Sequence, residues 1–149
     1  MNFRELDRQV LVADSAMRPR DMAEAVARGV TLAVNNRPDD EEDGQTSADD
    51  LAAAAKAGGL DYVHIPIDGP LSEDKVAALG KAMRGAEGRV LVFCRTGTRS
   101  AYLWAMARAR EGMPLDLLDR NARRAGYDET PLMPWLRRVA PAAGGPDPA

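Results

Sequence analysis

The sequence VLVFCRTGTRS, from Val90 to Ser100, joins an apolar run to a polar loop and contains the only cysteine of the chain. Four apolar residues precede Cys94, and the segment that begins at Ser100, SAYLWAMARAR, has the composition of a helix. A strand, a short loop and a helix in this order are typical of α/β proteins, which bind ligands beyond the carboxyl ends of their strands. We therefore expect Cys94 to lie at a ligand site.

The segments on either side of this stretch alternate between two kinds. Short apolar runs bounded by Gly, Asp or Asn predict strands at Val10–Ala13, Val30–Asn35, Tyr62–Ile67 and Val90–Phe93. Helical patterns occupy residues 19–29, 47–59, 72–85, 99–111, 114–125 and 132–139. Ser47 and Ser72 are the expected N-caps of two of these helices. The alternation predicts a three-layer α/β sandwich around a mainly parallel sheet of four to five strands.

Composition restricts the class of protein. With 149 residues we expect one domain, spanning residues 1–140, followed by a disordered Pro/Gly/Ala-rich tail at 141–149. A net charge of −3 argues against a nucleic-acid-binding module, and no apolar run approaches a membrane span. The charged N-terminus is unlike a signal peptide, so we expect a cytoplasmic protein. A single cysteine and a single histidine exclude an internal disulfide and make a metal site improbable; we predict no metal and no cofactor.

The loop after Cys94 has the composition of an anion-binding site. Backbone N–H groups of Thr96, Gly97 and Thr98 can point inward, and the following helix adds its unsatisfied N–H groups and the positive end of its dipole. Gly97 supplies the backbone freedom of a tight loop, and Arg99 adds a forked cation that can grip an oxyanion at two points. Because these features favour the thiolate, we predict that Cys94 is a nucleophile assisted by Arg99.

Three further polar residues are candidates for substrate binding. Ser100 is placed to hydrogen-bond the sulfur and to stabilise it as a leaving group. Arg95 lies in the loop itself and is a candidate for holding carboxylates of a second substrate. Arg37 follows the second predicted strand at the same edge of the sheet, where it either binds the substrate anion or pairs with the neighbouring acids. The run 38–50 carries seven acidic residues, and we expect it to be a solvated loop.

Two segments resemble known families. The loop CRTGTRS resembles the active-site loops of cysteine-dependent phosphatases and of rhodaneses. The segment LDYVHIPIDGPLSEDKVAALGKAM resembles the strand and loop that precede the active site in dual-specificity phosphatases, in which an Asp after the strand is the general acid. That resemblance implies a cysteine-phosphatase-like fold and implies that Asp68 is the acid. The dipeptide Asp-Gly is also a common turn, and this alone would explain Asp68.

Together with GVTLAVNNRPDDEE and ARRAGYDETPL, these segments make the chain similar to a specific bacterial family. Its members are small phosphatase-fold proteins, also found fused to beta-lactamase-like hydrolases, and are described either as phosphatases or as sulfur transferases. The resemblance covers roughly residues 10–136.

The spacing of the loop favours sulfur over phosphate. Typical cysteine phosphatases place five residues between Cys and Arg, whereas four separate Cys94 from Arg99, and Phe93 replaces the His that often precedes the cysteine. We therefore predict a sulfur transferase, in which Cys94 takes a sulfur atom from thiosulfate or a persulfide and passes it to a small thiol such as glutathione. The first alternative is a phosphatase that forms a phosphocysteine and uses Asp68 as acid. The second is a non-catalytic anion-binding module.

Overall fold

The computed structural model of the protein describes residues 1–140, and the predicted disordered tail lies outside the described residues. One five-stranded sheet has the order β1-β2-β5-β3-β4. Its strands are β1 Phe3–Glu5, β2 Val10–Ala13, β3 Val30–Asn35, β4 Asp61–His64 and β5 Arg89–Phe93. All neighbours are parallel except β1 and β2, which confirms the mainly parallel sheet.

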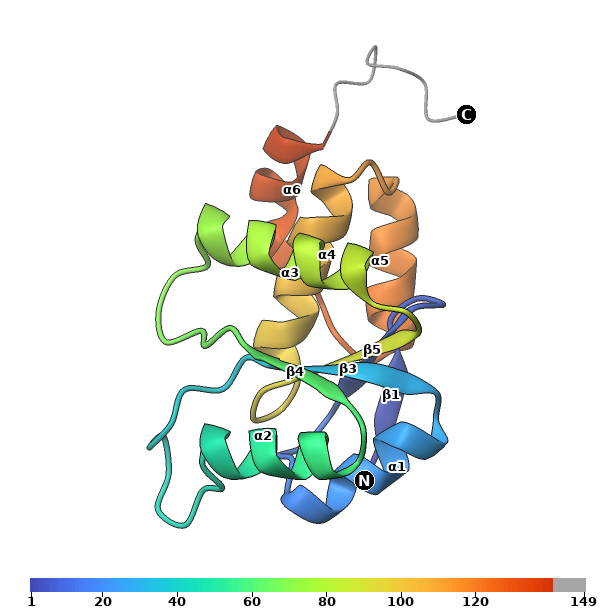
Figure 1. The fold of residues 1–149 in the computed structure, drawn as a ribbon. Helices are drawn as coiled ribbons and strands as arrows, with labels where there is room; N and C mark the ends of the chain where they lie inside the picture. The colour runs from blue at the N-terminus through green and yellow to red at the C-terminus, as the bar shows by residue number, and fades with distance from the viewer. Residues whose placement is uncertain (141–149) are drawn as a thin grey trace.

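Helices cover both faces of the sheet, which confirms the three-layer sandwich (Figure 1). One face carries α1 Met22–Ala27 and α2 Ala48–Ala57, and a 3-10 turn at Pro19–Asp21 leads into α1. The other face carries α3 Glu73–Gly85, α4 Thr98–Arg110, α5 Leu115–Arg124 and α6 Met133–Val139, and a 3-10 turn at Thr130–Leu132 leads into α6. The loops that follow β3, β4 and β5 all emerge on the same side of the sheet, at the left of Figure 1.

Local signals in the sequence account for several of these boundaries. The Ser47 hydroxyl accepts a hydrogen bond from the Asp50 N–H and the Ser72 hydroxyl accepts one from the Lys75 N–H, so both predicted caps are confirmed. Gly29, with φ of 82°, follows the end of α1 as expected of a helix-terminating glycine.

The structure differs from the prediction at two strands, β1 and β4. β1 was not predicted, because in Phe3–Glu5 only Phe3 is buried and three residues give no readable alternation. β4 ends at His64 and not at Ile67, because Pro66 has no N–H for a regular ladder. The main chain nevertheless stays attached to β3, since Ile65 N–H donates to Asn35 O at 2.8 Å.

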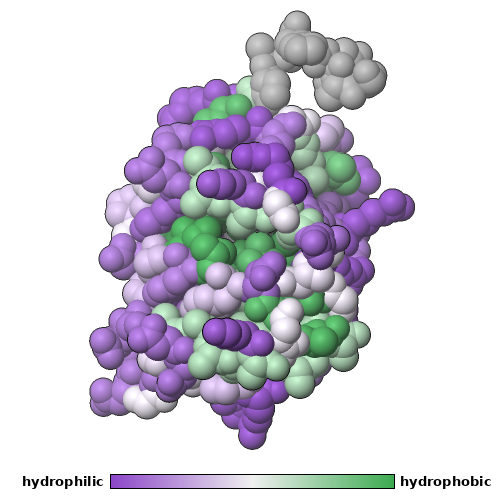
Figure 2. Space-filling view, in the orientation of Figure 1, coloured by the Kyte–Doolittle hydropathy of each residue, from purple (hydrophilic) through white to green (hydrophobic). Residues whose placement is uncertain are grey.

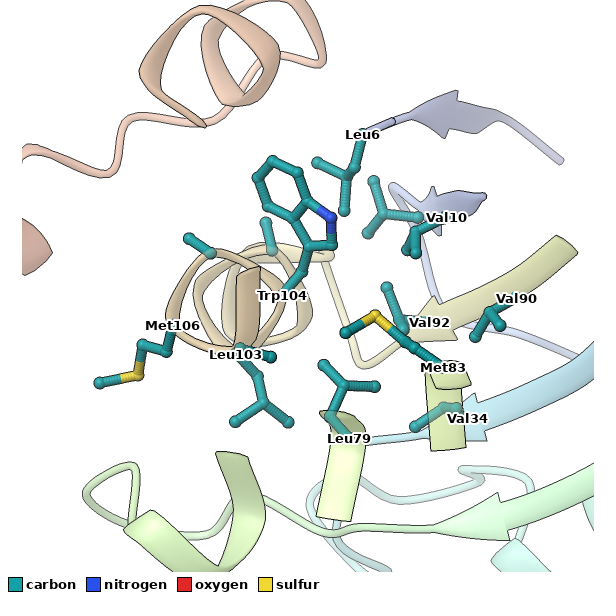
Figure 3. Packing of buried hydrophobic residues seen from close by; sticks show 14 of the residues in the cluster. Leu6, Val10, Val34, Leu79, Met83, Val90, Val92, Leu103, Trp104 and Met106 are labelled. Atoms are coloured by element: carbon teal, nitrogen blue, oxygen red, sulfur yellow. The ribbon is translucent and has the colours of Figure 1, made fainter. Parts of the chain in front are cut away.

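Alternate side chains of β5 enter two separate cores. Val90 and Val92 pack under α3–α6, whereas Leu91 and Phe93 pack under α1 and α2. Figure 3 shows Trp104 of α4 directed toward Leu6 and Val10, and Leu103 of the same helix toward Leu79. All of these side chains are nearly inaccessible to solvent.

The side chain of Trp104 is also fixed by polar contacts at the N-terminal end of β2. Its Nε1 donates to Asp7 Oδ2 at 2.7 Å, and Arg108 Nε donates to the same oxygen at 2.8 Å. Asp7 Oδ1 accepts from two backbone N–H groups at 2.8 Å each. These contacts fix the rotation of α4 about its axis, and therefore the direction in which its first turn faces.

The surface is mixed in character. Figure 2 shows apolar side chains in the band between α3 and β4, where a cavity of about 410 Å³ is lined in part by Val63 and Ala82. Within residues 1–140, no helix combines the length and the hydrophobicity needed to cross a membrane.

Glu129 is a buried carboxyl group in the segment between α5 and α6. Glu129 is 1% exposed, and neither of its carboxylate oxygens has a hydrogen-bond partner among residues 1–140. Burial raises the pKa of Glu129 to about 7, and the nearby Asp119 adds to the effect while Arg123 opposes it. The ordinary pKa of 4.5 applies in the unfolded chain.

We predict that the free energy of unfolding falls as the pH rises from about 4.5 to about 7 and that Glu129→Gln removes this decline. In this window the unfolded chain releases the proton while the folded protein retains it, so rising pH favours unfolding. Urea denaturation at pH 5 and pH 8 measures the difference. The exposed Glu87→Gln is the matched control and should keep the wild-type pH dependence; an unchanged slope in Glu129→Gln would contradict the prediction.

Candidate active site

Strand β5 delivers Cys94 to the carboxyl edge of the sheet. It lies between β2 and β3, and Asn36 N–H donates to the carbonyl of Phe93 at 2.7 Å directly before the cysteine. The Cys94 residue is 1% exposed, and its Sγ accepts a hydrogen bond from the Gly97 N–H at 3.1 Å. The loop therefore folds back over the sulfur with one N–H group directed at it, as expected of an anion-binding loop.

Only glycine fits at position 97. Its φ of 92° lies in the left-handed region, and it forms the N-cap of α4. A Cβ atom at this position would overlap the Tyr127 hydroxyl and would lie 2.7 Å from the carbonyl oxygen of Ala13. The same Tyr127 hydroxyl donates to the carbonyl of Thr96 at 2.9 Å. The chain after α5 therefore covers the outer side of the loop.

The guanidinium of Arg99 is held along one edge and free along another. Nη1 and Nη2 donate to the two carboxylate oxygens of Glu41 at 2.7 and 2.9 Å, and Nη1 also donates to the carbonyl of Ile67 at 2.8 Å. The hydrogen bond with Glu41 raises the pKa of Arg99, and attraction to the nearby Cys94 raises it further. These contacts leave Nε and one N–H of Nη2 for an anion on the Cys94 side.

Glu41 and Glu42 belong to the acidic run that we expected to be a solvated loop; both residues are exposed as expected, but their carboxylates also pair with arginines. Arg37 is buried, and its Nε donates to Glu41 at 3.0 Å while its Nη2 donates to Glu42. Glu42 also lies 3.2 Å from Nε of Arg95. Of the two alternatives for Arg37, pairing with the neighbouring acids is the one observed. The hydrogen bond from Arg99 lowers the pKa of Glu41, so this carboxylate stays ionised at neutral pH.

Gln45 gives the turn that carries these carboxylates a defined shape. Its Oε1 accepts from the backbone N–H groups of Glu41 and Glu42 at 3.0 and 3.3 Å. Its Nε2 donates to the carbonyl of Pro38 at 2.8 Å. We call residues 38–46 the acidic turn.

Ser100 and His64 make structural contacts. Ser100 is buried, and its hydroxyl donates to Asn36 Oδ1 at 2.7 Å and not to the sulfur, contrary to the expected contact. Asn36 in turn donates to the carbonyl of Ile65 at 2.9 Å, so it ties three segments together. His64 Nε2 lies 2.9 Å from the carbonyl oxygen of Arg37, in a hydrogen bond that supports the acidic turn.

The remaining predicted residues lie at the rim. The Asp68 side chain is 76% exposed, and its nearest charged partner is Lys75, at 3.5 Å. The hydroxyl groups of Thr96 and Thr98 lie 3.3 Å apart on the exposed side of the loop. Arg95 is also exposed. The structure therefore brings together Cys94, the loop and Arg99, and leaves the exposed Asp68 carboxylate paired with Lys75.

The sequence analysis did not identify Glu41, Glu42 or Asn36 as residues that support the site. It also missed the contact of Tyr127 with the loop. Within residues 1–140, no group of three His, Cys, Asp or Glu side chains is arranged to hold a metal ion. The groups that face the sulfur are an N–H and a guanidinium edge, and both suit an anion.

The comparisons with known proteins give one consistent family. The sequence model of the family described as "Beta-lactamase hydrolase-like protein, phosphatase-like domain" matches residues 2–111. A beta-lactamase hydrolase-like protein of Xylella fastidiosa (strain Temecula1) is 36% identical over 115 residues, which are 76% of this chain and 27% of that protein. One from Agrobacterium fabrum is 33% identical over 124 residues, which are 82% of this chain and 29% of that protein. The chain thus spans little more than a quarter of these relatives.

Solved structures agree on the fold. A candidate phosphatase from Neisseria meningitidis matches with a TM-score of 0.79 at 28% identity, over 91% of this chain and 96% of that one. TpbA of P. aeruginosa, solved in complex with phosphotyrosine, matches with a TM-score of 0.60 at 18% identity, over 86% and 76% of the two chains. The second likeness shows a shared fold of the cysteine-phosphatase type.

We predict that Glu41→Gln weakens the binding of an oxyanion such as tungstate by about tenfold, the effect of losing one charge-assisted hydrogen bond. The amide cannot accept both N–H groups of Arg99, so the free edge of the guanidinium loses its orientation toward Cys94. Calorimetric titration measures the affinity, with the exposed Glu87→Gln as control. Tighter binding in Glu41→Gln would show the opposite, that Glu41 competes with the anion for Arg99.

Proposed function

This chain belongs to the phosphatase-like domain family of beta-lactamase hydrolase-like proteins, and we propose from that premise that it hydrolyses phosphate monoesters through a phosphocysteine on Cys94. The observation that carries the proposal is the free edge of Arg99, held beside Cys94 by Glu41 and Ile67 on its other side. A phosphoryl group has three equatorial oxygens, and such an edge can bind two of them.

In the proposed first step, the Cys94 thiolate attacks phosphorus and the bond to the ester oxygen breaks. Arg99 and the backbone N–H groups of Thr96 and Thr98 bind the equatorial oxygens and stabilise their charge. Water then attacks the phosphocysteine, and the thiolate leaves with inorganic phosphate as the product. Gly97 N–H, which already donates to the sulfur, stabilises it as the leaving group.

We propose that the other predicted residues contribute indirectly or at the rim. Arg37 donates from Nε to Glu41 and from Nη2 to Glu42, so these two nitrogens are not free for a substrate. Arg37 therefore positions Glu41, and through Glu41 it positions Arg99. Ser100 fixes the start of α4 through Asn36. Arg95 adds positive charge at the entrance.

Asp68 is the proposed acid for the leaving oxygen. The carbonyl oxygen of Ile67, the residue before it, accepts a hydrogen bond from Nη1 of Arg99, so the main chain at Asp68 lies beside the site. Rotation of the Asp68 side chain away from Lys75 would bring the carboxyl group toward the ester oxygen. The complex of TpbA with phosphotyrosine supports a phosphate ester as the ligand of this type of fold.

Sulfur transfer is the second candidate. It rests on the four residues between Cys94 and Arg99, which enclose less space than the usual five. The relatives described above are named for phosphatase or hydrolase chemistry, and their names give no support to sulfur transfer. We therefore prefer the phosphatase to the sulfur transferase that the loop spacing favoured.

We also propose that residues 1–140 form one domain. α5 and α6 pack on α4, beyond residue 111 where the family match ends. The activity of the full-length relatives, of which this chain covers little more than a quarter, is not transferred to it.

We predict that Cys94→Ser abolishes phosphate release from p-nitrophenyl phosphate, because the alcohol is a far weaker nucleophile than a thiolate. The variant should retain tungstate binding, which shows that its loop is intact. Intact mass after incubation with thiosulfate tests the second candidate. A wild-type gain of one sulfur atom that glutathione removes, without phosphate release, would replace the phosphatase with the sulfur transferase.

We predict that the effect of Asp68→Asn depends on the leaving group. General acids contribute roughly 10²–10⁴-fold where the leaving oxygen must be protonated, so an alkyl phosphate should lose activity by about that factor. p-Nitrophenyl phosphate, whose leaving group needs no proton, should lose far less. Lys75→Gln is the matched control, since it frees Asp68 without removing it. Equal losses on both esters would assign Asp68 to the turn alone.

A further inference from the structure

A cavity of about 530 Å³ lies between the segments that follow β2 and β3, the two strands beside β5, and is not used by the proposed chemistry. One wall is the segment that follows β2, with Ser15, Met17 and Arg18. The other wall is the acidic turn, with Glu42 and Asp43. Figure 2 shows hydrophilic surface at the lower left, where Figure 1 places the loop after β3.

Both walls of this cavity are attached to the catalytic loop. Glu42 pairs with Arg95, the residue directly after Cys94. On the opposite wall, the segment from Ser15 to Arg18 begins two residues after Ala13, whose carbonyl lies against Gly97. The cavity is therefore positioned to receive the part of a substrate that extends away from the sulfur.

Two charges of opposite sign are available in the cavity. The Arg18 side chain is 57% exposed and forms an ion pair with Asp21, whose carboxylate is 3.7 Å from Nε and makes no hydrogen bond to it. Asp43 is exposed and has no ion-pair partner in the part of the chain that the structure describes. Arg37 and Glu42, which also line the cavity, neutralise each other.

A cation and an anion on opposite walls match a ligand that carries both charges. We propose that the cavity binds an unblocked amino acid, with its carboxylate at Arg18 and its ammonium at Asp43, as the body of the ester that Cys94 cleaves. The phosphate ester as the reacting group rests on the proposed function. The specificity for the amino-acid part rests on Arg18 and Asp43 alone. The substrate class is then a phosphorylated free amino acid, in preference to a phosphorylated position within a protein.

Binding to Cys94→Ser protein tests the assignment without requiring turnover. The probes are O-phospho-L-tyrosine, its N-acetyl amide in which both charges are blocked, and p-cresyl phosphate, which lacks the amino-acid part. Each charge-assisted contact contributes about tenfold or more, so the free amino acid should bind at least tenfold more tightly than the other two probes. In the same background, Arg18→Ala and Asp43→Asn should each lower that preference, whereas Arg20→Ala and Asp40→Asn should keep it.

The outcomes separate this proposal from the proposed function. Equal affinity for the free and the blocked ester, or a preference that survives both Arg18→Ala and Asp43→Asn, overturns the amino-acid site even when wild-type protein hydrolyses all three esters. Absence of hydrolysis by wild-type protein overturns the phosphatase, while a preference for the free amino acid in the binding assay still supports the site. Weaker binding of p-cresyl phosphate to the Arg18→Ala protein would show a general loss of the loop and would also overturn the proposal.

Discussion

The position of β5 between two parallel strands determines where every functional group of this protein lies. Val92 pairs with Val12 of β2 on one side and with Val34 of β3 on the other, so three carboxyl ends meet at one edge. The sulfur of Cys94 extends from the middle strand. Ala13, at the end of β2, lies against Gly97, and Arg37, after the end of β3, directly precedes the acidic turn. No separate device is needed to assemble the site, because the sheet does so.

Charge balance then decides how the site is arranged. Three arginines that gather at one edge repel each other, and two adjacent glutamates of the acidic turn compensate for them. The compensation is directional. Glu41 engages Nη1 and Nη2 of Arg99 and leaves Nε and one N–H of Nη2 without a hydrogen-bond partner within residues 1–140, so the cation is held without being blocked. Gln45 matters for the same reason, since it keeps both carboxylates on the required side of the turn.

Local features could be predicted from the sequence, whereas long-range pairings could not. Ser47, Ser72 and the Cys94–Arg99 loop carry their signal within a few residues, and the structure places them as local chemistry requires. The contact of Glu41 with Arg99 joins residues 58 positions apart, and an acidic run has the same composition whether it is solvated or folded onto arginines. β1 could not be predicted for a related reason. Its three residues form a strand because they pair with β2, and their own sequence pattern does not indicate one.

The contact of Tyr127 with the loop has a consequence for where this unit ends. The family match stops at residue 111, but the hydroxyl that covers Thr96 and Gly97 comes from 16 residues later in the chain, and Leu118 and Leu136 fill the core beneath α4. The family model therefore covers a smaller segment than the one whose contacts surround the loop. A protein shortened to the matched region would keep every residue of the proposed chemistry and lose the wall that keeps the loop closed.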